Sequence, residues 1–239
     1  MLKFGLIKVP IKQQIVQALV LSMRPQTNNI GLMRMAGPKA INVVALIHQL
    51  QKITHNLPEP MCTVLAHQYN NDPFVILIAC LLSLRARDSV TMPIVQKLLT
   101  QARTPQQLLS LSDKALQTII YSLGFYKRKT FVLKTVAREL IERFDGKVPD
   151  SENDLLSLTG VGRKTANLVL AEAFGRPAIA VDTHVHRLAN VLGLVKTKTP
   201  EQTEQALMKL VPKNYWRSIN RLLVTCGQQK CDLSAITLK

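Results

Sequence analysis

Residues 151–194, SENDLLSLTGVGRKTANLVLAEAFGRPAIAVDTHVHRLANVLGL, contain two apolar segments of helical spacing on either side of a turn at Thr159-Gly160-Val161-Gly162. The two glycines allow backbone conformations that other residues resist, and we expect Val161 to pack inward and fix the turn. They also leave bare N–H groups at the positive end of the next helix, where a phosphate can approach. The stretch predicts a helix–hairpin–helix, which grips the DNA backbone without reading its sequence. The alternative is an ordinary pair of helices joined by a glycine-rich turn.

Lys164 follows the hairpin directly and is the candidate nucleophile. A lysine must lose its proton before it attacks, and a free lysine holds that proton until about pH 10.4. The positive end of the helix and the neighbouring Arg163 both favour the neutral amine. Amine nucleophiles of this kind form Schiff bases with carbonyl groups. The plainer interpretation is that Lys164, like Arg163, contacts a DNA phosphate.

Asp182 stands eighteen residues after Lys164, just before a segment of helical apolar spacing. An aspartate in that position is typical of a helix N-cap, and capping would orient its carboxylate. A fixed carboxylate near Lys164 could stabilise positive charge developing on a deoxyribose, or relay a proton. Its negative charge would also hold the proton on Lys164. His184, two residues further on, is either a DNA-binding residue of the site or a structural helix residue.

The charge of the chain favours a polyanionic partner. Its 239 residues carry a formal net charge of +16, and a hydrophobic content of 47% is enough for a buried core. Like charges repel, so the excess does not serve stability, and nucleic acid is the commonest partner of such proteins. A ribosome-associated or merely basic protein is the alternative. The longest apolar run, 74–84, is shorter than the ~20 residues that cross a bilayer, so we expect a buried helix and no membrane partner.

From about residue 40 the chain carries residues typical of helix starts and helix ends, and segments of alternating apolar and polar residues are nearly absent. The pairs Thr104-Pro105 and Thr199-Pro200, each followed by a glutamine, predict N-capped helix starts. Several glycines each close an apolar-periodic segment, as glycines at helix C-termini do: Gly124, Gly146, Gly175 and Gly227. We therefore predict an all-α fold.

Residues 1–40 are predicted to be a basic N-terminal extension of marginal fold. The first acidic residue of the chain is Glu59, and Gly37-Pro38 marks a boundary near residue 40. The extension is a DNA-touching arm, an organelle-targeting segment or a product of start-site choice. The four cysteines imply no disulfide framework in a chain of this length, and hence a reducing compartment. We expect a cytoplasmic protein associated with the nucleoid, with organelle targeting as the alternative.

The segments LTGVGRKTANLVLAEAF and AIAVDTHVHRLAN resemble the signature of the endonuclease III family of helix–hairpin–helix DNA glycosylases. The resemblance runs from about residue 45 to Cys231, and it includes DPFVILIACLLSLRARDSVT and LGFYKRK. In that family the matching lysine is the Schiff-base nucleophile and the matching aspartate is the catalytic acid. The resemblance therefore implies these roles for Lys164 and Asp182.

The resemblance also implies an architecture and further DNA contacts. It implies two helical lobes with the active site in the cleft between them: residues 66–176, which contain the hairpin, and residues 41–65 plus 177–239. Family members push side chains into the duplex where the damaged nucleotide turns out. Arg85 stands where the matching loop usually offers a glutamine, and Phe125 matches the apolar wedge on the other side. For Phe125 the alternative is a core aromatic residue.

Many members of the family carry four cysteines, spaced C-x6-C-x2-C-x5-C, that hold an iron–sulfur cluster. Cys231 matches the first of these ligands, whereas Leu238 stands at the second. One ligand cannot hold a four-cysteine cluster, so we expect a form of the family without it. The five histidines show no convincing metal-ligand spacing. We therefore expect no metal ion and no cofactor.

The resemblance implies a bifunctional enzyme of base-excision DNA repair. It would remove damaged bases, with oxidised pyrimidines as the expected lesions, and cleave the abasic site by β-elimination. Its partner would be double-stranded DNA with damaged bases or abasic sites, bound by a monomer. Two alternatives stay open: a monofunctional mismatch or adenine glycosylase, and a non-catalytic helix–hairpin–helix DNA-binding protein. Lys164 argues against the first, which generally lacks the hairpin lysine, and Lys164 with Asp182 argues against the second.

Overall fold

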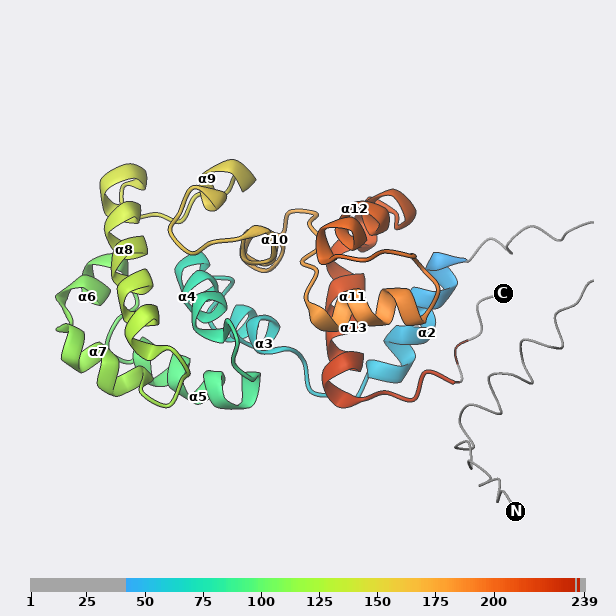
Figure 1. Cartoon of the computed structure of the whole chain (residues 1–239), viewed down its shortest axis with the longest axis horizontal. Helices are drawn as coiled ribbons and strands as arrows, with labels where there is room; N and C mark the ends of the chain where they lie inside the picture. The colour runs from blue at the N-terminus through green and yellow to red at the C-terminus, as the bar shows by residue number, and fades with distance from the viewer. Residues whose placement is uncertain (1–41, 235, 237–239) are drawn as a thin grey trace, which may run out of the picture. The chain divides into compact units, whose positions relative to one another are not determined.

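The computed structural model describes residues 42–234 and residue 236, and every regular element in these residues is a helix (Figure 1). The predicted all-α fold is therefore confirmed. The predicted basic extension, residues 1–40, lies outside the described residues. Within the part that the structure describes, no helix is both long enough and apolar enough to span a bilayer.

One group of helices, which we call the first lobe, packs around a first hydrophobic core. It comprises α3 (Met61–Gln68), α4 (Pro73–Ser83), α5 (Asp88–Leu99), α6 (Pro105–Ser110), α7 (Asp113–Ile120), α8 (Tyr126–Phe144), α9 (Glu152–Leu156) and α10 (Arg163–Glu172). The central element is α4, in which every residue from Phe74 to Leu82 is buried. The reason is that α3, α5, α8 and α10 all pack against it. The apolar run of the sequence is therefore a buried helix, as predicted.

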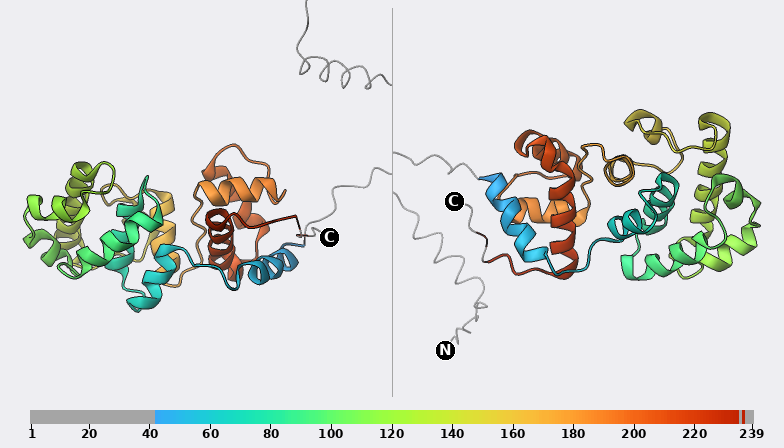
Figure 2. Two further views of the ribbon diagram at one scale, coloured as in Figure 1. Left: turned by 90° about the horizontal axis from the view of Figure 1, so that it is seen from below. Right: turned by 180° about the vertical axis from the view of Figure 1, so that it is seen from behind.

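A second group of helices, which we call the second lobe, has its own hydrophobic core. It comprises α2 (Val43–Thr54), α11 (Thr183–Val191), α12 (Pro200–Leu210), the 3-10 turn η1 (Lys213–Tyr215) and α13 (Trp216–Gln229). Helix α13 packs against both α2 and α11 (Figures 1 and 2). Because α2 precedes the first lobe and α11 to α13 follow it, segments far apart in the sequence build this core.

The first lobe begins earlier in the chain than the sequence analysis places it. The prediction that residues 41–65 belong to the second lobe is wrong from Met61 onward, because Met61 and Leu65 lie in the first core. The physical reason is that α3 packs its apolar residues against α4. The chain returns to the second lobe between Ala178, which lies in the first core, and Ile179, which lies in the second.

The helix starts at Thr104 and Thr199 follow the sequence prediction. Each threonine hydroxyl accepts a hydrogen bond from the backbone N–H of the glutamine three residues later, Gln107 (3.2 Å) or Gln202 (3.3 Å). Each glutamine side chain reaches back to the N–H of the residue that precedes the cap. These bonds satisfy donors that a helix start leaves without intrahelical partners.

The prediction of a helix end is confirmed at Gly146 and Gly175 and is wrong at Gly227. Gly146 and Gly175 have φ values of +71° and +63° just beyond α8 and α10. Gly227 lies inside α13, which continues to its cap at Lys230. A Cβ at Gly227 would lie 2.5 Å from Nδ1 of His184, so glycine is needed there for the close approach of α11 to α13.

Candidate active site

The hairpin that joins α9 to α10 is fixed from α8. Gly160 has a φ of +79°, a left-handed conformation that favours glycine, and a Cβ there would lie 2.8 Å from Cγ1 of Val132. Val161 is buried in the first core, as predicted. The carboxylate of Glu139 accepts hydrogen bonds from the N–H (2.8 Å) and the hydroxyl (2.6 Å) of Thr159. Contacts within the protein therefore hold the turn against α8.

Gly162 differs from Gly160, and here the expectation of an unusual backbone is wrong. Its φ of −100° and ψ of 176° are extended values that any residue adopts, and a Cβ would meet no atom within 4 Å. Gly162 is the N-cap of α10, and no side chain caps this helix start. The first N–H groups of α10 therefore stay open to an anion.

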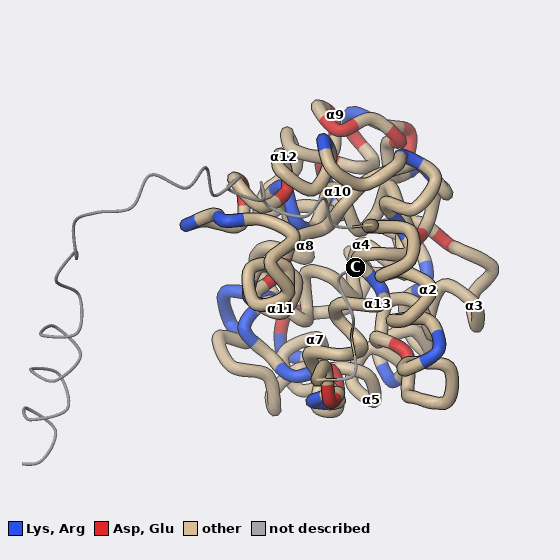
Figure 3. Tube along the Cα trace, turned by 90° about the vertical axis from the view of Figure 1, so that its right-hand side faces the viewer, with Lys and Arg blue, Asp and Glu red and all other residues tan. Residues whose placement is uncertain are grey.

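Acidic side chains stand beside the hairpin. Asp150, Glu152 and Asp154 lie in and just before α9, and Figure 3 shows acidic positions gathered there. Asp150 forms an ion pair with Arg176. These carboxylates repel phosphate, so the anion-binding capacity of the hairpin lies in its backbone N–H groups and in cations that the acids do not neutralise.

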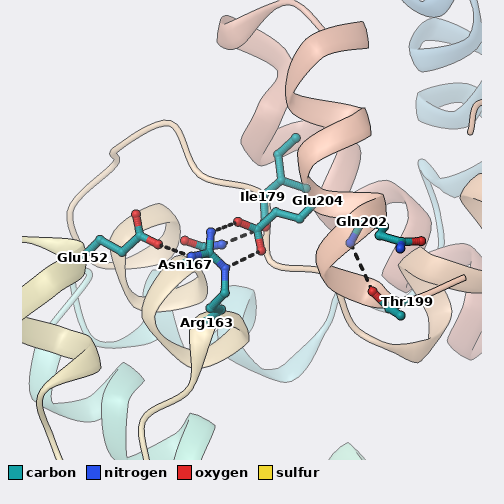
Figure 4. A network of polar contacts seen from close by, with 7 residues as sticks. All are labelled: Glu152, Arg163, Asn167, Ile179, Thr199, Gln202 and Glu204. Atoms are coloured by element: carbon teal, nitrogen blue, oxygen red, sulfur yellow. Dashed lines mark hydrogen bonds and ion pairs between the residues drawn. The ribbon is translucent and has the colours of Figure 1, made fainter. Parts of the chain in front are cut away.

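Arg163 joins the two lobes instead of projecting freely toward a ligand (Figure 4). Its Nη2 donates to Oε1 of Glu204 at 2.5 Å, its Nε donates to Oε2 of Glu204 at 3.3 Å, and its Nη1 lies 3.1 Å from Oε1 of Glu152. The hydrogen bond to the buried Glu204 raises the pKa of Arg163. Two carboxylates compensate this charge, which argues against the expected role of Arg163 as a phosphate ligand.

Lys164 and Asp182 line the same pocket. Lys164 is the second residue of α10, in the first lobe, and Asp182 is the N-cap of α11, in the second. Oδ1 of Asp182 accepts a hydrogen bond from the N–H of Val185 at 2.9 Å, so the predicted cap is confirmed. The cap fixes the orientation of the Asp182 carboxylate at a place where elements of both lobes meet.

Two buried asparagines hold the extended segment that leads to Asp182. Nδ2 of Asn167, in α10, donates to the carbonyl oxygen of Ile179 at 3.1 Å, and Nδ2 of Asn220, in α13, donates to that of Ala180. Neither interaction was predicted from the sequence, because each joins a side chain on a helix to a backbone carbonyl of the extended segment. The bond from Asn167 ties the segment before Asp182 to α10, the helix that carries Lys164, and the bond from Asn220 ties it to α13.

The pocket contains further polar residues that the sequence analysis missed. Oδ2 of Asp88 accepts hydrogen bonds from the N–H of Met61 (3.1 Å) and from Nε2 of Gln228 (2.8 Å), and Ser83 lies on the same lining. The only sequence signal for Asp88 is its place in the first turn of a helix, which does not reveal that it faces a pocket.

Cys62 also lines the pocket, with its Sγ 3.7 Å from Sγ of Cys80. The hydrogen bond with Cys80, and then burial, raise the pKa of the Cys62 thiol well above its ordinary value. A protonated thiol is a poor nucleophile. The Cys62 thiol is therefore a poor candidate for nucleophilic chemistry in this pocket.

His184 does not line this pocket and packs against Gly227 of α13 instead. Its side chain is half-buried. The structure therefore favours the structural alternative for His184 over a role in binding DNA.

Arg85 and Phe125, the two residues expected to probe the duplex, are neighbours on the first lobe. The Cζ atom of Arg85 lies 5.8 Å from the centroid of the Phe125 ring. Both have left-handed backbones, with φ values of +58° and +61°, which are uncommon for residues other than glycine. Phe125 is 65% exposed, so the alternative of a core aromatic residue is wrong.

The cysteines do not fit a four-cysteine iron–sulfur cluster. Cys62 and Cys80 lie in the first core, whereas Cys226 and Cys231 lie in the second lobe. Burial, and then a hydrogen bond with Cys231, raise the pKa of Cys226 to about 12. Across residues 42–234 and 236, no group of three or more His, Cys, Asp or Glu gathers as metal ligands do. Position 238, which the resemblance pairs with a second ligand, lies outside the described residues.

Comparison with known proteins agrees with this arrangement. A model of the family described as HhH-GPD superfamily base excision DNA repair protein matches residues 78–213. Endonuclease III of Thermotoga maritima is 48% identical over 160 residues, which cover 67% of this chain and 75% of that protein. Endonuclease III of Haemophilus influenzae is 36% identical over 191 residues, which cover 80% of this chain and 89% of that protein.

Solved structures show the same fold. The structure of a trapped endonuclease III–DNA covalent intermediate aligns with a TM-score of 0.70 at 30% identity, over 82% of this chain and 92% of that one. A non-covalent endonuclease III–DNA complex aligns with a TM-score of 0.71 at 30% identity, over 82% and 88% of the two chains. From its hairpin, its two-lobed helical fold and these relatives, the chain belongs to the endonuclease III family of DNA glycosylases/lyases, within the HhH-GPD superfamily of base-excision DNA repair proteins.

Proposed function

We propose that Lys164 is the nucleophile and Asp182 the assisting acid of a bifunctional reaction on damaged double-stranded DNA. The observation that carries this proposal is the single pocket that both side chains line, one from α10 and one from the cap of α11. The covalent intermediate trapped in a relative of 30% identity supports covalent chemistry in this fold. The reaction removes the base and then cleaves the strand at the abasic site.

The reaction begins when the damaged nucleotide turns out of the duplex into the pocket. Nζ of Lys164 forms a bond to C1′ of the sugar, while the bond from C1′ to the base breaks and the base leaves with that electron pair. The sugar ring then opens as O4′ leaves C1′, which gives the Schiff base. Loss of a proton from C2′ expels the 3′ phosphate by β-elimination, and water hydrolyses the imine to restore Lys164.

Asp182 assists because its carboxylate is fixed beside the reacting carbon. The N–H of Val185 holds one oxygen, and the tethered segment behind Asp182 prevents it from turning away. A fixed negative charge stabilises the positive charge that develops at C1′ as the base departs. The carboxylate also accepts a proton from Lys164, which leaves the amine free to attack. As an acid it then donates that proton to O4′ when the sugar ring opens.

The DNA is gripped and opened by groups outside the pocket. The open N–H groups that follow Gly162 bind a backbone phosphate, together with Gly160 and Val161 of the turn. Arg85 and Phe125 enter the gap that the departing nucleotide leaves, and their exposure and contact suit this role. None of these contacts reads a base sequence, so binding is general for duplex DNA.

We further propose that oxidised pyrimidines are the preferred lesions and that the protein acts as a monomer at the nucleoid. Membership of the endonuclease III family supports the lesion class, and the formal net charge of +16 supports action on DNA. The turned-out nucleotide would enter the pocket that Lys164 and Asp182 line.

A duplex with one oxidised pyrimidine tests the proposed function. The protein should release the base and cut the strand without alkali, leaving an unsaturated sugar at the 3′ end. Asp182→Asn should slow base release by roughly 100-fold while changing the DNA dissociation constant far less. Base release that needs alkali for strand cleavage would indicate the monofunctional alternative. Binding without base release would indicate the non-catalytic one.

A further inference from the structure

Lys129 is a buried cation that the proposed function leaves without a role. It belongs to the first turns of α8 and is 8% exposed. Its Nζ donates to the carbonyl oxygens of Leu84 (2.7 Å) and Leu82 (2.8 Å), with a longer contact to that of Leu81 (3.5 Å). These carbonyls lie at the C-terminal end of α4, where a helix leaves acceptors without intrahelical partners.

The charge of Lys129 is stabilised by these carbonyl groups and not by an acid. In the described part of the chain, no ion pair joins Lys129 to a carboxylate, and burial lowers its pKa. A cation at the negative end of a helix is favourable, and here it binds the end of α4 at two short distances. Lys129 therefore fixes the place where α4 ends.

Lys129 forms hydrogen bonds to the backbone at or beside both residues that are proposed to enter the duplex. Its side chain holds the carbonyl of Leu84, which is the residue before Arg85. Its backbone N–H donates to the carbonyl of Phe125 at 2.9 Å. A turn bond from Ala86 N–H to the carbonyl of Ser83 (2.9 Å) closes the loop that carries Arg85. One residue thus connects two segments that are forty positions apart in the sequence.

We propose that Lys129 is a positioning residue that holds Arg85 and Phe125 as one preorganised unit for entry into the duplex. This inference rests on the proposed function, because it assumes that both side chains enter the gap. Without the Nζ bonds, the loop after α4 can separate from the start of α8. The left-handed backbone of Arg85 and its contact with Phe125 are then no longer enforced, and entry must order them anew.

Lys134 provides a matched control on the same helix. Its Nζ donates to the carbonyl oxygens of Leu109 (2.9 Å) and Leu111, at the end of α6. The chemistry is the same as that of Lys129, but it stabilises α6 and not the end of α4. The variant Lys134→Met therefore shows how far the removal of any such lysine from α8 changes the measured rates.

The test uses a duplex that carries a stable tetrahydrofuran abasic analogue opposite 2-aminopurine, whose fluorescence rises when it loses its stacking. In stopped-flow mixing, Lys129→Met should slow the rise in fluorescence by roughly tenfold, because the probing side chains are misplaced. On a separate duplex with one oxidised pyrimidine, it should lower kcat for base release by a similar factor. KM should change far less. Lys129→Arg, which keeps the charge and the donors, should recover most of the rate, and Lys134→Met should match the wild type.

An unchanged fluorescence rise in Lys129→Met, or an equal loss in Lys134→Met, overturns the positioning role while leaving the proposed function intact. Arg85→Ala and Phe125→Ala test separately whether these two side chains enter the duplex. If both leave the fluorescence rise unchanged, the side chains do not enter the duplex, and the role of Lys129 is overturned with that assignment. If Lys129→Met fails to fold, Lys129→Gln, whose amide is too short to reach both carbonyls, takes its place in the same comparison.

Discussion

Gly160 and Gly162 stand two residues apart in the hairpin, yet the physical reason for glycine differs between them. Gly160 is required by the protein itself, because its φ is +79° and Val132 occupies the space of a Cβ. Gly162 has an ordinary backbone and empty surroundings, so the fold does not require it. A glycine there keeps the open N–H groups of α10 accessible to the phosphate that we propose binds them.

We predict that Gly162→Ala separates DNA affinity from stability. Its free energy of unfolding should stay within about 1 kcal/mol of wild type, because loss of a good N-cap residue opposes the lower entropy of the unfolded chain. Gly160→Ala should lower it by about 1–3 kcal/mol through strain. Urea denaturation measures both. Fluorescence anisotropy on undamaged duplex should show weaker binding for Gly162→Ala, and a wild-type affinity would contradict the phosphate contact.

At the scale of elements, α10 carries a contact to the second lobe at each of its two ends. Arg163 at its start binds Glu204 of α12 (Figure 4), and the buried Glu172 at its end accepts a hydrogen bond from Arg217 of α13 at 3.3 Å. Both glutamates are buried, whereas the arginines are partly exposed. Because Lys164 lies on this helix, these contacts also set its position relative to the second lobe.

We predict that Arg163→Met weakens the fold and leaves phosphate binding unchanged. Glu204 would stay buried without its partner, which should lower the free energy of unfolding by about 1–3 kcal/mol, less than for a fully buried pair because Arg163 is 43% exposed. The double variant Arg163→Met/Glu204→Leu should recover part of this loss. Denaturant unfolding gives both values.

The salt dependence of DNA binding decides between the two roles of Arg163. A phosphate ligand contributes roughly 0.9 to the slope of log affinity against log salt concentration. Arg163→Met should leave that slope unchanged, since its guanidinium already binds two carboxylates. A slope that falls by about one such unit would restore Arg163 to the DNA-binding surface.

At the scale of the whole molecule, the sequence predicted the features that depend on residues close together in the chain. The apolar run of α4, the cap at Thr104 and the hairpin turn are local patterns, and each is confirmed. The bond between Asp88 and Gln228 joins positions 140 residues apart, so no local pattern reports it. For the same reason the helix end predicted at Gly227 is wrong, because its partner His184 belongs to another helix.

We predict that the purified protein contains no iron–sulfur cluster. Its four cysteines are divided between two cores, and the second core is packed by buried residues such as Leu207, Ile219 and Leu223. Each of these contributes on the order of 1.5–3 kcal/mol through burial before entropy costs. The protein should be colourless, and Cys231→Ser should keep base-release activity. Stoichiometric iron in the purified protein would contradict this prediction.

The central claim is that Lys164 bonds to the sugar, and one measurement tests it directly. Borohydride reduces a Schiff base to a stable amine, so incubation with an abasic duplex should yield a covalent protein–DNA complex. Digestion and mass spectrometry should then locate the sugar remnant on Lys164, and Lys164→Gln should give no complex while still binding the abasic duplex. A remnant on any other amine, or undiminished trapping in Lys164→Gln, would contradict the mechanism.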